Sequence, residues 1–315
     1  MRWLPAESWC CATGFTPSKA GRWTVKRCTA WLPGSGSSAS WSIGRRISCL
    51  KYCASQLVPV GRGLAGMVVI IPAHDEQERL GRCLDSVRAA MDHLAGACPQ
   101  VEAMAIVVAD SCSDGTAQIA RRHISEDPRI SLQQVGYGNV GASRAAGARY
   151  ALAGLGARMD PASIWLASTD AETSVPENWL AGFAELHARG ADAVVGTVQP
   201  DRGELDEHLF NLWQQAYHPV EGHGHIHGAN CGVSAAAYLG VGGFEPLAAH
   251  EDVALVASLR RAGYRVQATA RVQATARVQA TARMQVLTSG RLHGRLREGF
   301  ADYLAGLEHQ MLRAR

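Results

Sequence analysis

Short apolar runs alternate along the chain with longer segments whose hydrophobic positions recur with a helical period. Within residues 76–93, Leu80, Leu84, Val87 and Met91 recur at spacings of four, three and four, the apolar stripe of an amphipathic helix. We expect strands at 68–71, 105–109, 130–135 and 164–167, and helices at 76–93, 141–152 and 177–189, with another helix opening near residue 114. This alternation predicts an α/β fold with a mostly parallel central sheet flanked by helices.

The pattern is less regular in the second half of the chain. We expect a strand at 193–198, helices at 207–217, 252–262 and 295–312, and a loop rich in glycine and histidine at 221–230. The loop and the helix at 252–262 carry several polar side chains, so this half also contributes candidates for a functional site.

One segment is an internal repeat. The residues Arg-Val-Gln-Ala-Thr-Ala occur at 265–270, 271–276 and 277–282, and polar and apolar positions alternate strictly. This alternation predicts a strand with one apolar face. Because six is an even number, each added unit keeps the same residues on the same face. We interpret one unit as a native strand and the rest of 265–282 as a tandem insertion, which either lengthens an edge ribbon or loops out.

The net charge of +3 hides two different compositions. Residues 1–66 hold all three lysines, six arginines and a single acid, Glu7, whereas the remainder carries a formal charge of −5. The same segment holds five of the eight tryptophans and five of the nine cysteines without any periodicity. We interpret 1–66 as a non-native or disordered basic extension and 67–315 as one domain. A basic arm for nucleic acid or a membrane surface, or a targeting peptide, is the weaker alternative.

The cysteines are scattered and form neither a disulfide framework nor a paired zinc motif, which suits reduced thiols in a cytoplasmic protein. No apolar run reaches the ~18 residues that a membrane-spanning helix needs. We therefore expect a cytoplasmic protein without a transmembrane segment, with peripheral attachment to a membrane left open.

Carboxylates follow two of the predicted strands. Asp170 and Glu172 come directly after one strand, and Asp110 follows another. Because ligands of parallel sheets bind at the carboxyl ends of strands, we expect these acids to face one cleft. The pair at 170 and 172 can bind Mg²⁺ or Mn²⁺, which would bridge a diphosphate, although solvated loop acids give the same spacing. Asp110 can accept hydrogen bonds from a base or a ribose, and Asp114 can cap the next helix.

Two further motifs stand at predicted helix starts. Gly141 would allow a close backbone approach, and Arg144 could meet a phosphate or anchor a carboxylate. Glu251 and Asp252 precede the helix at 252–262, where either acid could act as a general base toward a hydroxyl or simply cap the helix.

Histidines gather in the loop before residue 230, at His218, His223, His225 and His227. Neutral imidazoles could bind a metal such as Mn²⁺ or Zn²⁺. We favour a loop that lines an acceptor pocket, with His225, His227 and Asn230 on the acceptor side.

Taken in order, these motifs resemble those of family 2 glycosyltransferases with the GT-A fold, over about Met67 to Leu307. They are Pro72-Ala-His-Asp-Glu76, Asp110-Ser-Cys-Ser-Asp-Gly-Thr116, Asn139-Val-Gly-Ala-Ser-Arg144, Asp170-Ala-Glu172 and Glu251-Asp252. The chain departs from the usual pattern at His74, where an aromatic residue is usual, and at Glu172, where aspartate is usual.

For the donor side, the resemblance implies that Ala73 and Glu76 line the nucleotide pocket and that Asp110 holds the nucleobase. Arg144 matches the arginine after the family's glycine turn and joins the nucleotide-sugar site.

For the reacting groups, the resemblance implies that Asp170 touches the ribose or the metal and that Glu172 is a direct metal ligand. Asp252 matches the catalytic base, with Glu251 beside it as a rival. Arg291 falls where related enzymes place a cationic segment that faces the diphosphate.

The implied reaction transfers a sugar from a UDP- or GDP-sugar to a small-molecule or lipid-linked acceptor, with inversion and with Mg²⁺ or Mn²⁺. Two alternatives are a nucleotide-sugar-binding module without turnover and a sugar nucleotidyltransferase. The latter needs a glycine-rich basic loop after its first strand, whereas residues 72–76 are acidic. No nucleic acid partner is expected.

Overall fold

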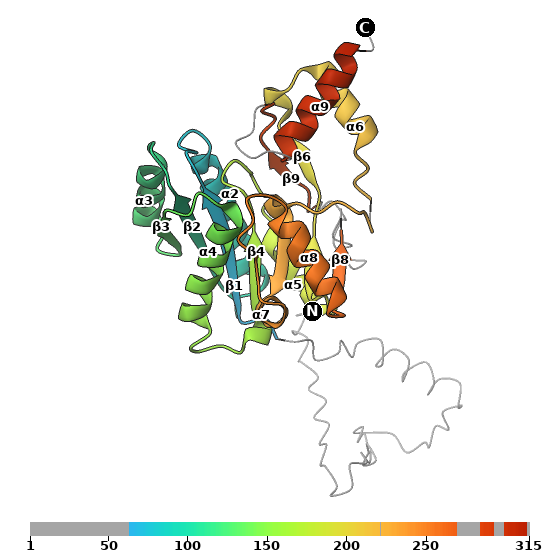
Figure 1. The fold of residues 1–315 in the computed structure, drawn as a ribbon. Coiled ribbons are helices and arrows are strands. Elements are labelled where there is room, and N and C mark those ends of the chain that lie inside the picture. Colours follow the sequence, from blue (N-terminus) through green and yellow to red (C-terminus); the bar gives the residue numbers. More distant parts are fainter. Residues whose placement is uncertain (1–62, 221, 270–283, 293–298, 314–315) are drawn as a thin grey trace, which may run out of the picture. The chain divides into compact units, whose positions relative to one another are not determined.

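A seven-stranded sheet with the order β3-β2-β1-β4-β7-β5-β8 forms the centre of the computed structural model, which describes residues 63–220, 222–269, 284–292 and 299–313 (Figure 1). Its strands are β1 Gly66–Ala73, β2 Glu102–Asp110, β3 Ile130–Val135, β4 Ile164–Ser168, β5 Ala193–Val195, β7 Cys231–Ser234 and β8 Val266–Ala268. All neighbouring strands are parallel except β7, which runs antiparallel to β4 and β5. The mostly parallel sheet expected from the sequence is confirmed.

Helices cover both faces of this sheet. Met67, Val69 and Ile71 of β1 pack on one face and Val68 and Ile70 on the other, as alternation along a strand requires. The first face is covered by α2 Leu80–Ala97, α3 Thr116–Glu126 and α5 Trp179–Ala188, and the second by α4 Val140–Leu155, α7 Ala235–Gly240 and α8 Glu251–Arg261. Burial on both faces explains why the strands read as continuous apolar runs.

A smaller sheet and two helices stand beyond the carboxyl ends of the main strands. β6 Val198–Pro200 pairs in parallel with β9 Val286–Thr288, and α6 Glu207–Ala216 lies beside α9 Phe300–Arg313 (Figure 1). Short 3₁₀ turns complete the described elements at Pro161–Ser163, Arg202–Glu204 and Gly228–Asn230.

The prediction of a single strand at 193–198 is wrong. The chain leaves the main sheet after Val195 and enters the second sheet at Val198. Asn230 sits beside this break, where its side-chain amide donates to the Thr197 carbonyl at 2.9 Å. The side chain of a residue 33 positions away thus stabilises the bend.

Other differences concern element ends and two omissions. The first helix begins at Leu80 instead of residue 76, because the preceding residues form the turn after β1. β7 and α7 are short and were not predicted. β1 starts before Met67, since Gly66 pairs with Glu102 and Ile164. The interpretation of residues 1–66 as an extension stays a prediction, and residues 1–62 lie outside the described part.

The first repeat unit forms the edge strand β8, paired with β5. Residues 270–283 lie outside the described residues, so the tandem insertion stays a prediction. The C-terminal helix begins at Phe300 rather than near 295, and residues 293–298 are also outside the description. No described helix combines the length and the apolar character needed to cross a membrane.

Candidate active site

A cleft of about 690 Å³ lies at the carboxyl ends of β1, β2 and β4. The loop before α8, the residues after β9 and the start of α9 close its other sides. This is the position at which open α/β sheets bind ligands, and the volume suits a ligand of nucleotide-sugar size.

Three carboxylates, Glu76, Asp170 and Glu172, face one another on one side of the cleft. Arg291 lies between two of them: its Nη1 donates to Glu76 Oε1 at 2.9 Å and its Nη2 to Glu172 Oε1 at 3.0 Å. Burial and the nearby charge of Asp170 raise the pKa of Glu172. The cluster thus carries excess negative charge that a cation stabilises.

These residues fit a hard divalent cation. Mg²⁺ and Mn²⁺ prefer oxygen ligands, and Glu76, Asp170 and Glu172 supply carboxylate oxygens beside an open cleft. The guanidinium of Arg291 already occupies a cation position between two of them. The role of Asp170 and Glu172 as metal ligands stays a prediction.

The buried side chain of Arg144 contacts two acids that line the cleft, Asp170 and Glu251. It lies on α4, is 3% exposed, and donates from Nε to Ser168 Oγ at 3.0 Å. Its Nη2 contacts Asp170 and its Nη1 contacts Glu251 in two ion pairs. A Cβ on Gly228 would lie 2.5 Å from Nη2 of this guanidinium, so only glycine lets the histidine loop pass over it.

The two acids at the start of α8 have different environments. Glu251 is 3% exposed and is held in its ion pair with Arg144. Asp252 lines the cleft and is partly exposed, and its Oδ1 accepts the neighbouring Val253 amide at 2.8 Å. His250, just before them, has a left-handed φ of 63°, a strained conformation of the kind that gathers at functional sites. Asp252 is therefore the more accessible carboxylate of the two.

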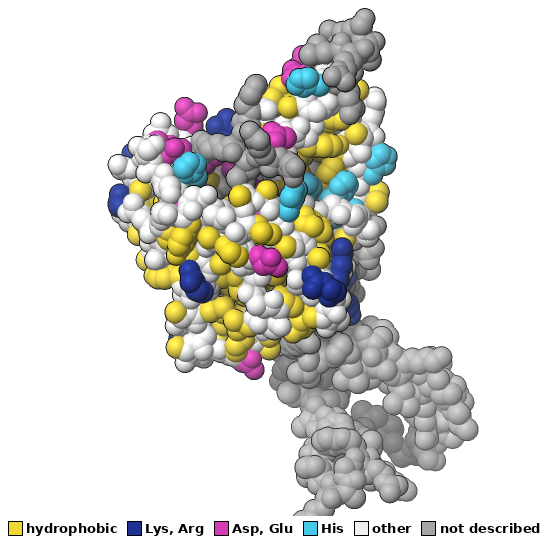
Figure 2. Space-filling model, in the orientation of Figure 1, with side chains coloured by type: hydrophobic (Ala, Val, Ile, Leu, Met, Phe, Trp, Pro, Cys, Tyr) yellow, Lys and Arg dark blue, Asp and Glu magenta, His cyan; other side chains and the backbone are white. Residues whose placement is uncertain are grey.

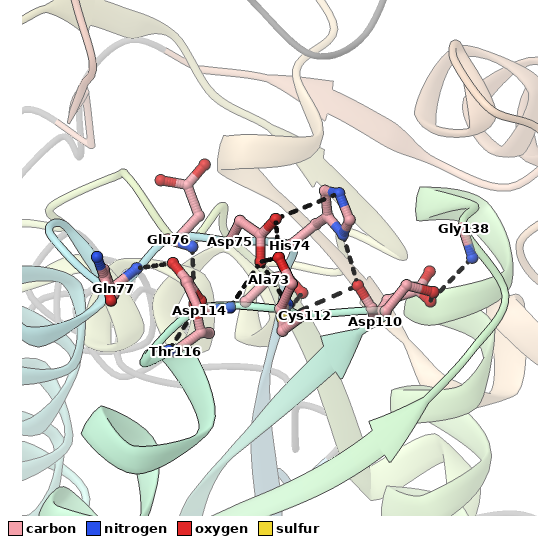
Figure 3. Close-up of polar contacts among 12 residues, drawn as sticks. Ala73, His74, Asp75, Glu76, Gln77, Asp110, Cys112, Asp114, Thr116 and Gly138 are labelled. Atoms are coloured by element: carbon pink, nitrogen blue, oxygen red, sulfur yellow. Dashed lines mark hydrogen bonds and ion pairs between the residues drawn. The ribbon is translucent and has the colours of Figure 1, made fainter.

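Asp110 lies at the end of β2 with both carboxylate oxygens occupied. Oδ1 accepts the amides of Tyr137 and Gly138 at 2.7 and 2.9 Å, and Oδ2 accepts the Asn139 amide and the Ser143 hydroxyl at 2.9 and 2.7 Å. Figure 3 shows the contact with Gly138. Burial opposes the charge, but these hydrogen bonds outweigh it and lower the pKa of Asp110 to about 2. The carboxylate holds the loop before α4 rather than pointing freely at a base.

A second network braces the turn after β1 (Figure 3). Asp75, with a left-handed φ of 50°, accepts the Ser113 amide at 2.7 Å, and the Thr116 hydroxyl accepts the Glu76 amide at 2.8 Å. Asp114 accepts the Thr116 amide at 2.9 Å, in agreement with the capping role considered from the sequence. Asp75, Cys112 and Asp114 are close enough to share an ion. Their hydrogen bonds give them a structural task, which is to position Glu76.

The opposite side of the cleft is aromatic. His225 and His227 line it together with Tyr217, Phe300 and Tyr303. In the orientation of Figure 2, histidine side chains are visible between the positions of α6 and α8. Asn230, expected on the acceptor side, is fully buried and does not line the cleft. Its amide is used by Thr197, Met284 and Trp179, so its task is structural.

Residues 68–234, more than half of the chain, match the sequence profile of Glycosyl transferase family 2. The chain belongs to this family. The GT-A fold expected from the motifs agrees with the mostly parallel sheet covered by helices on both faces.

The chain is also similar in sequence to one curated protein. The Succinoglycan biosynthesis protein ExoA of Rhizobium meliloti (strain 1021) is 27% identical over 213 residues, which are 64% of this chain and 60% of the relative. The chain thus spans less than two thirds of that relative's length.

Two solved structures are similar in fold. The mannosyltransferase PcManGT from Pyrobaculum calidifontis, in complex with GDP-Man and Mn²⁺, is 16% identical, with 84% of this chain and 71% of that chain covered and a TM-score of 0.48. Glucosyl-3-phosphoglycerate synthase from Mycobacterium tuberculosis, in complex with Mn²⁺, UDP and glucosyl-3-phosphoglycerate, is 14% identical, with 88% and 84% covered and a TM-score of 0.44.

The fold places nearly all of the predicted site residues in one cleft. Those that line it are Ala73, Glu76, Asp110, Arg144, Asp170, Glu172, His225, His227, Glu251, Asp252 and Arg291. Gly141 does permit a close approach, but to protein backbone: its amide donates to the Leu247 carbonyl at 3.1 Å. The aromatic residues Tyr217, Phe300 and Tyr303 were missed, because aromatic positions on amphipathic helices are typical of a core.

We predict that Asp110→Asn lowers the free energy of unfolding at pH 7 by about 2 kcal/mol. This is the energy that corresponds to lowering the pKa of Asp110 from 3.8 to about 2. Because the folded pKa lies below the unfolded one, this stabilisation is present above about pH 4 and is lost as the pH falls toward 2. Urea unfolding at several pH values measures it. The difference between wild type and variant should shrink in acid. Glu78→Gln, at a side chain that is 80% exposed, is the control and should cost far less stability.

Proposed function

We propose that the protein transfers a sugar from a nucleoside-diphosphate sugar to the hydroxyl of an acceptor. The observation that supports this most directly is the arrangement of one cleft. A cluster of carboxylates paired with Arg291 lies on one side, and one accessible carboxylate, Asp252, lies on another. Membership of glycosyl transferase family 2 agrees with it.

On the donor side, Ala73 and Glu76 would line the nucleotide pocket, and Asp110 would act through the loop at 137–139 that it holds. Arg291 would exchange its carboxylate partners for the diphosphate, because a guanidinium binds both groups through paired hydrogen bonds. Asp170 and Glu172 would hold Mg²⁺ or Mn²⁺, which supplies charge stabilisation to the departing diphosphate.

On the acceptor side, Asp252 would accept the proton of the attacking hydroxyl as the new glycosidic bond forms and the bond to the diphosphate breaks. Direct attack of this kind inverts the anomeric centre. Glu251 would keep Arg144 in place. A cytoplasmic location, with a lipid-linked acceptor reached at a membrane surface or a small soluble acceptor, is part of the same proposal.

The proposal is tested by incubating the full chain with UDP-, GDP- and dTDP-sugars and measuring nucleoside diphosphate release with Mn²⁺, with Mg²⁺ and with EDTA. We expect release from at least one donor and its loss in EDTA. Binding of a donor without any release, with or without acceptors, would favour the non-catalytic binding module. Release of pyrophosphate from a nucleoside triphosphate and a sugar phosphate would favour the nucleotidyltransferase.

For the base, we predict that Asp252→Asn lowers the transfer rate by ~10²–10⁴-fold, the usual contribution of a general base, with unfolding unchanged. Glu251→Gln should instead cost about 2 kcal/mol of stability, because it weakens a buried charge-assisted contact to Arg144. Initial rates and thermal unfolding measure the two effects. Asp206→Asn, at the start of α6 and outside the cleft, is the matched control. Equal loss of rate with full stability in Glu251→Gln would make Glu251 the base.

For the cation site, we predict opposite effects of Arg291→Gln on two ligands. Mn²⁺ alone should bind more tightly, because Glu76 and Glu172 lose a competing cation. A nucleoside diphosphate should bind about tenfold more weakly in the presence of Mn²⁺, because the variant loses a charge-assisted hydrogen bond to the diphosphate. Titration calorimetry measures both. Arg149→Gln, exposed on α4, should change neither. Weaker Mn²⁺ binding in Arg291→Gln would contradict the competition.

A further inference from the structure

We propose that the acceptor is an uncharged sugar, whose ring packs against the aromatic wall of the cleft and whose reacting hydroxyl faces Asp252. The aromatic wall is Tyr217, His225, His227, Phe300 and Tyr303. This inference rests on the proposed transferase function and narrows its acceptor to one chemical class.

The rings of the aromatic wall form a connected surface. Tyr217 stacks on His225 with centroids 4.1 Å apart and planes inclined by 22°, and Trp213 stacks behind Tyr217 at 5.0 Å and 23°. Phe300 meets the edge of His227 at 6.1 Å and lies 6.2 Å from Tyr303. Flat rings of this kind suit the C–H face of a pyranose, which is apolar while its edge carries hydroxyls.

The inner part of the aromatic wall, at Tyr217, is held in place before any ligand binds. The Val198 amide donates to Tyr217 Oη at 3.2 Å, and the same Oη is hydrogen-bonded to His227 Nε2 at 3.0 Å. Tyr217 is 4% exposed, and Trp213 is buried behind it. A rigid surface loses little side-chain entropy when it binds a ligand, so weak ring contacts contribute fully to affinity.

The charges near the aromatic wall disfavour an anionic acceptor. Among the described residues that line the cleft, the guanidinium groups are Arg144 and Arg291, and both are paired with carboxylates. Burial, and then the neighbouring imidazoles, lower the pKa of His227 to about 3, and burial also lowers that of His225. Neutral imidazoles can donate to or accept from hydroxyls, but they do not neutralise a phosphate.

Asp252 adds to this preference. Its carboxylate lines the same cleft as the aromatic wall, so a second anion there would be repelled. A hydroxyl, by contrast, can donate its hydrogen to Asp252. A molecule that is rich in hydroxyls and carries no charge is a neutral sugar. An apolar lipid chain would use the rings but offer no hydrogen to the Asp252 carboxylate.

The test is saturation-transfer NMR on the full chain with methyl glycosides of glucose, galactose and mannose, compared with the matching sugar 1-phosphates, 3-phosphoglycerate and n-octanol. We expect at least one methyl glycoside to bind and the anions to bind at least tenfold more weakly. Tyr303→Ala and Phe300→Leu should weaken glycoside binding about tenfold. Tyr150→Ala, equally exposed on α4 but outside the cleft, should not.

Preference for a sugar phosphate, 3-phosphoglycerate or n-octanol over every methyl glycoside would overturn the inference, as would full glycoside binding in both wall variants. The binding assay separates this inference from the proposed function. Glycoside binding that depends on Tyr303, without turnover of any nucleotide sugar, would keep the sugar site and reject the transferase. Turnover of a nucleotide sugar without glycoside binding would keep the transferase and reject the sugar site.

Discussion

The double ion pair of Arg144 is the interaction on which the geometry of the cleft depends. A guanidinium at 3% exposure has lost nearly all its water, and only paired carboxylates make such burial tolerable. Asp170 approaches it from the end of β4 and Glu251 from the start of α8. Removal of either acid would leave a buried charge partly uncompensated. The end of β4 and the start of α8 are thus held together by a single side chain.

This interaction also divides the work between two adjacent acids. Successive residues of a helix point about 100° apart, so at the start of α8 one carboxylate can face inward while the next faces the cleft. Arg144 binds Glu251 and thereby sets the helix phase. Asp252 then lies in the cleft without an arginine partner among the described ion pairs. A base needs a lone pair within reach of the acceptor, and a carboxylate in a buried ion pair would be a weak one.

The sequence alone predicted the elements whose signal is local. Apolar runs located β1 to β4, since burial on both faces leaves an unbroken hydrophobic stretch, and strand-end acids located the cleft. What it missed depends on distant partners. The break between β5 and β6 needs Asn230, and the aromatic wall joins Tyr217 to residues more than 80 positions away. A motif also cannot reveal whether its lone pairs are already used. Asp110 and Asn230 both carry suitable groups, yet protein donors and acceptors occupy them.

Charge links the two halves of the cleft under the proposed function. The described lining holds six carboxylates, Glu76, Asp110, Asp170, Glu172, Glu251 and Asp252, against two guanidinium groups. Backbone amides balance Asp110, and Arg144 balances Glu251, but the cluster at the donor side keeps a surplus that already raises the pKa of Glu172. A diphosphate would meet repulsion there unless positive charge came with it. The same surplus extends to Asp252, where it favours an acceptor that brings hydroxyls and no charge. The same excess of negative charge therefore favours a donor that binds together with a cation and an acceptor that carries no charge.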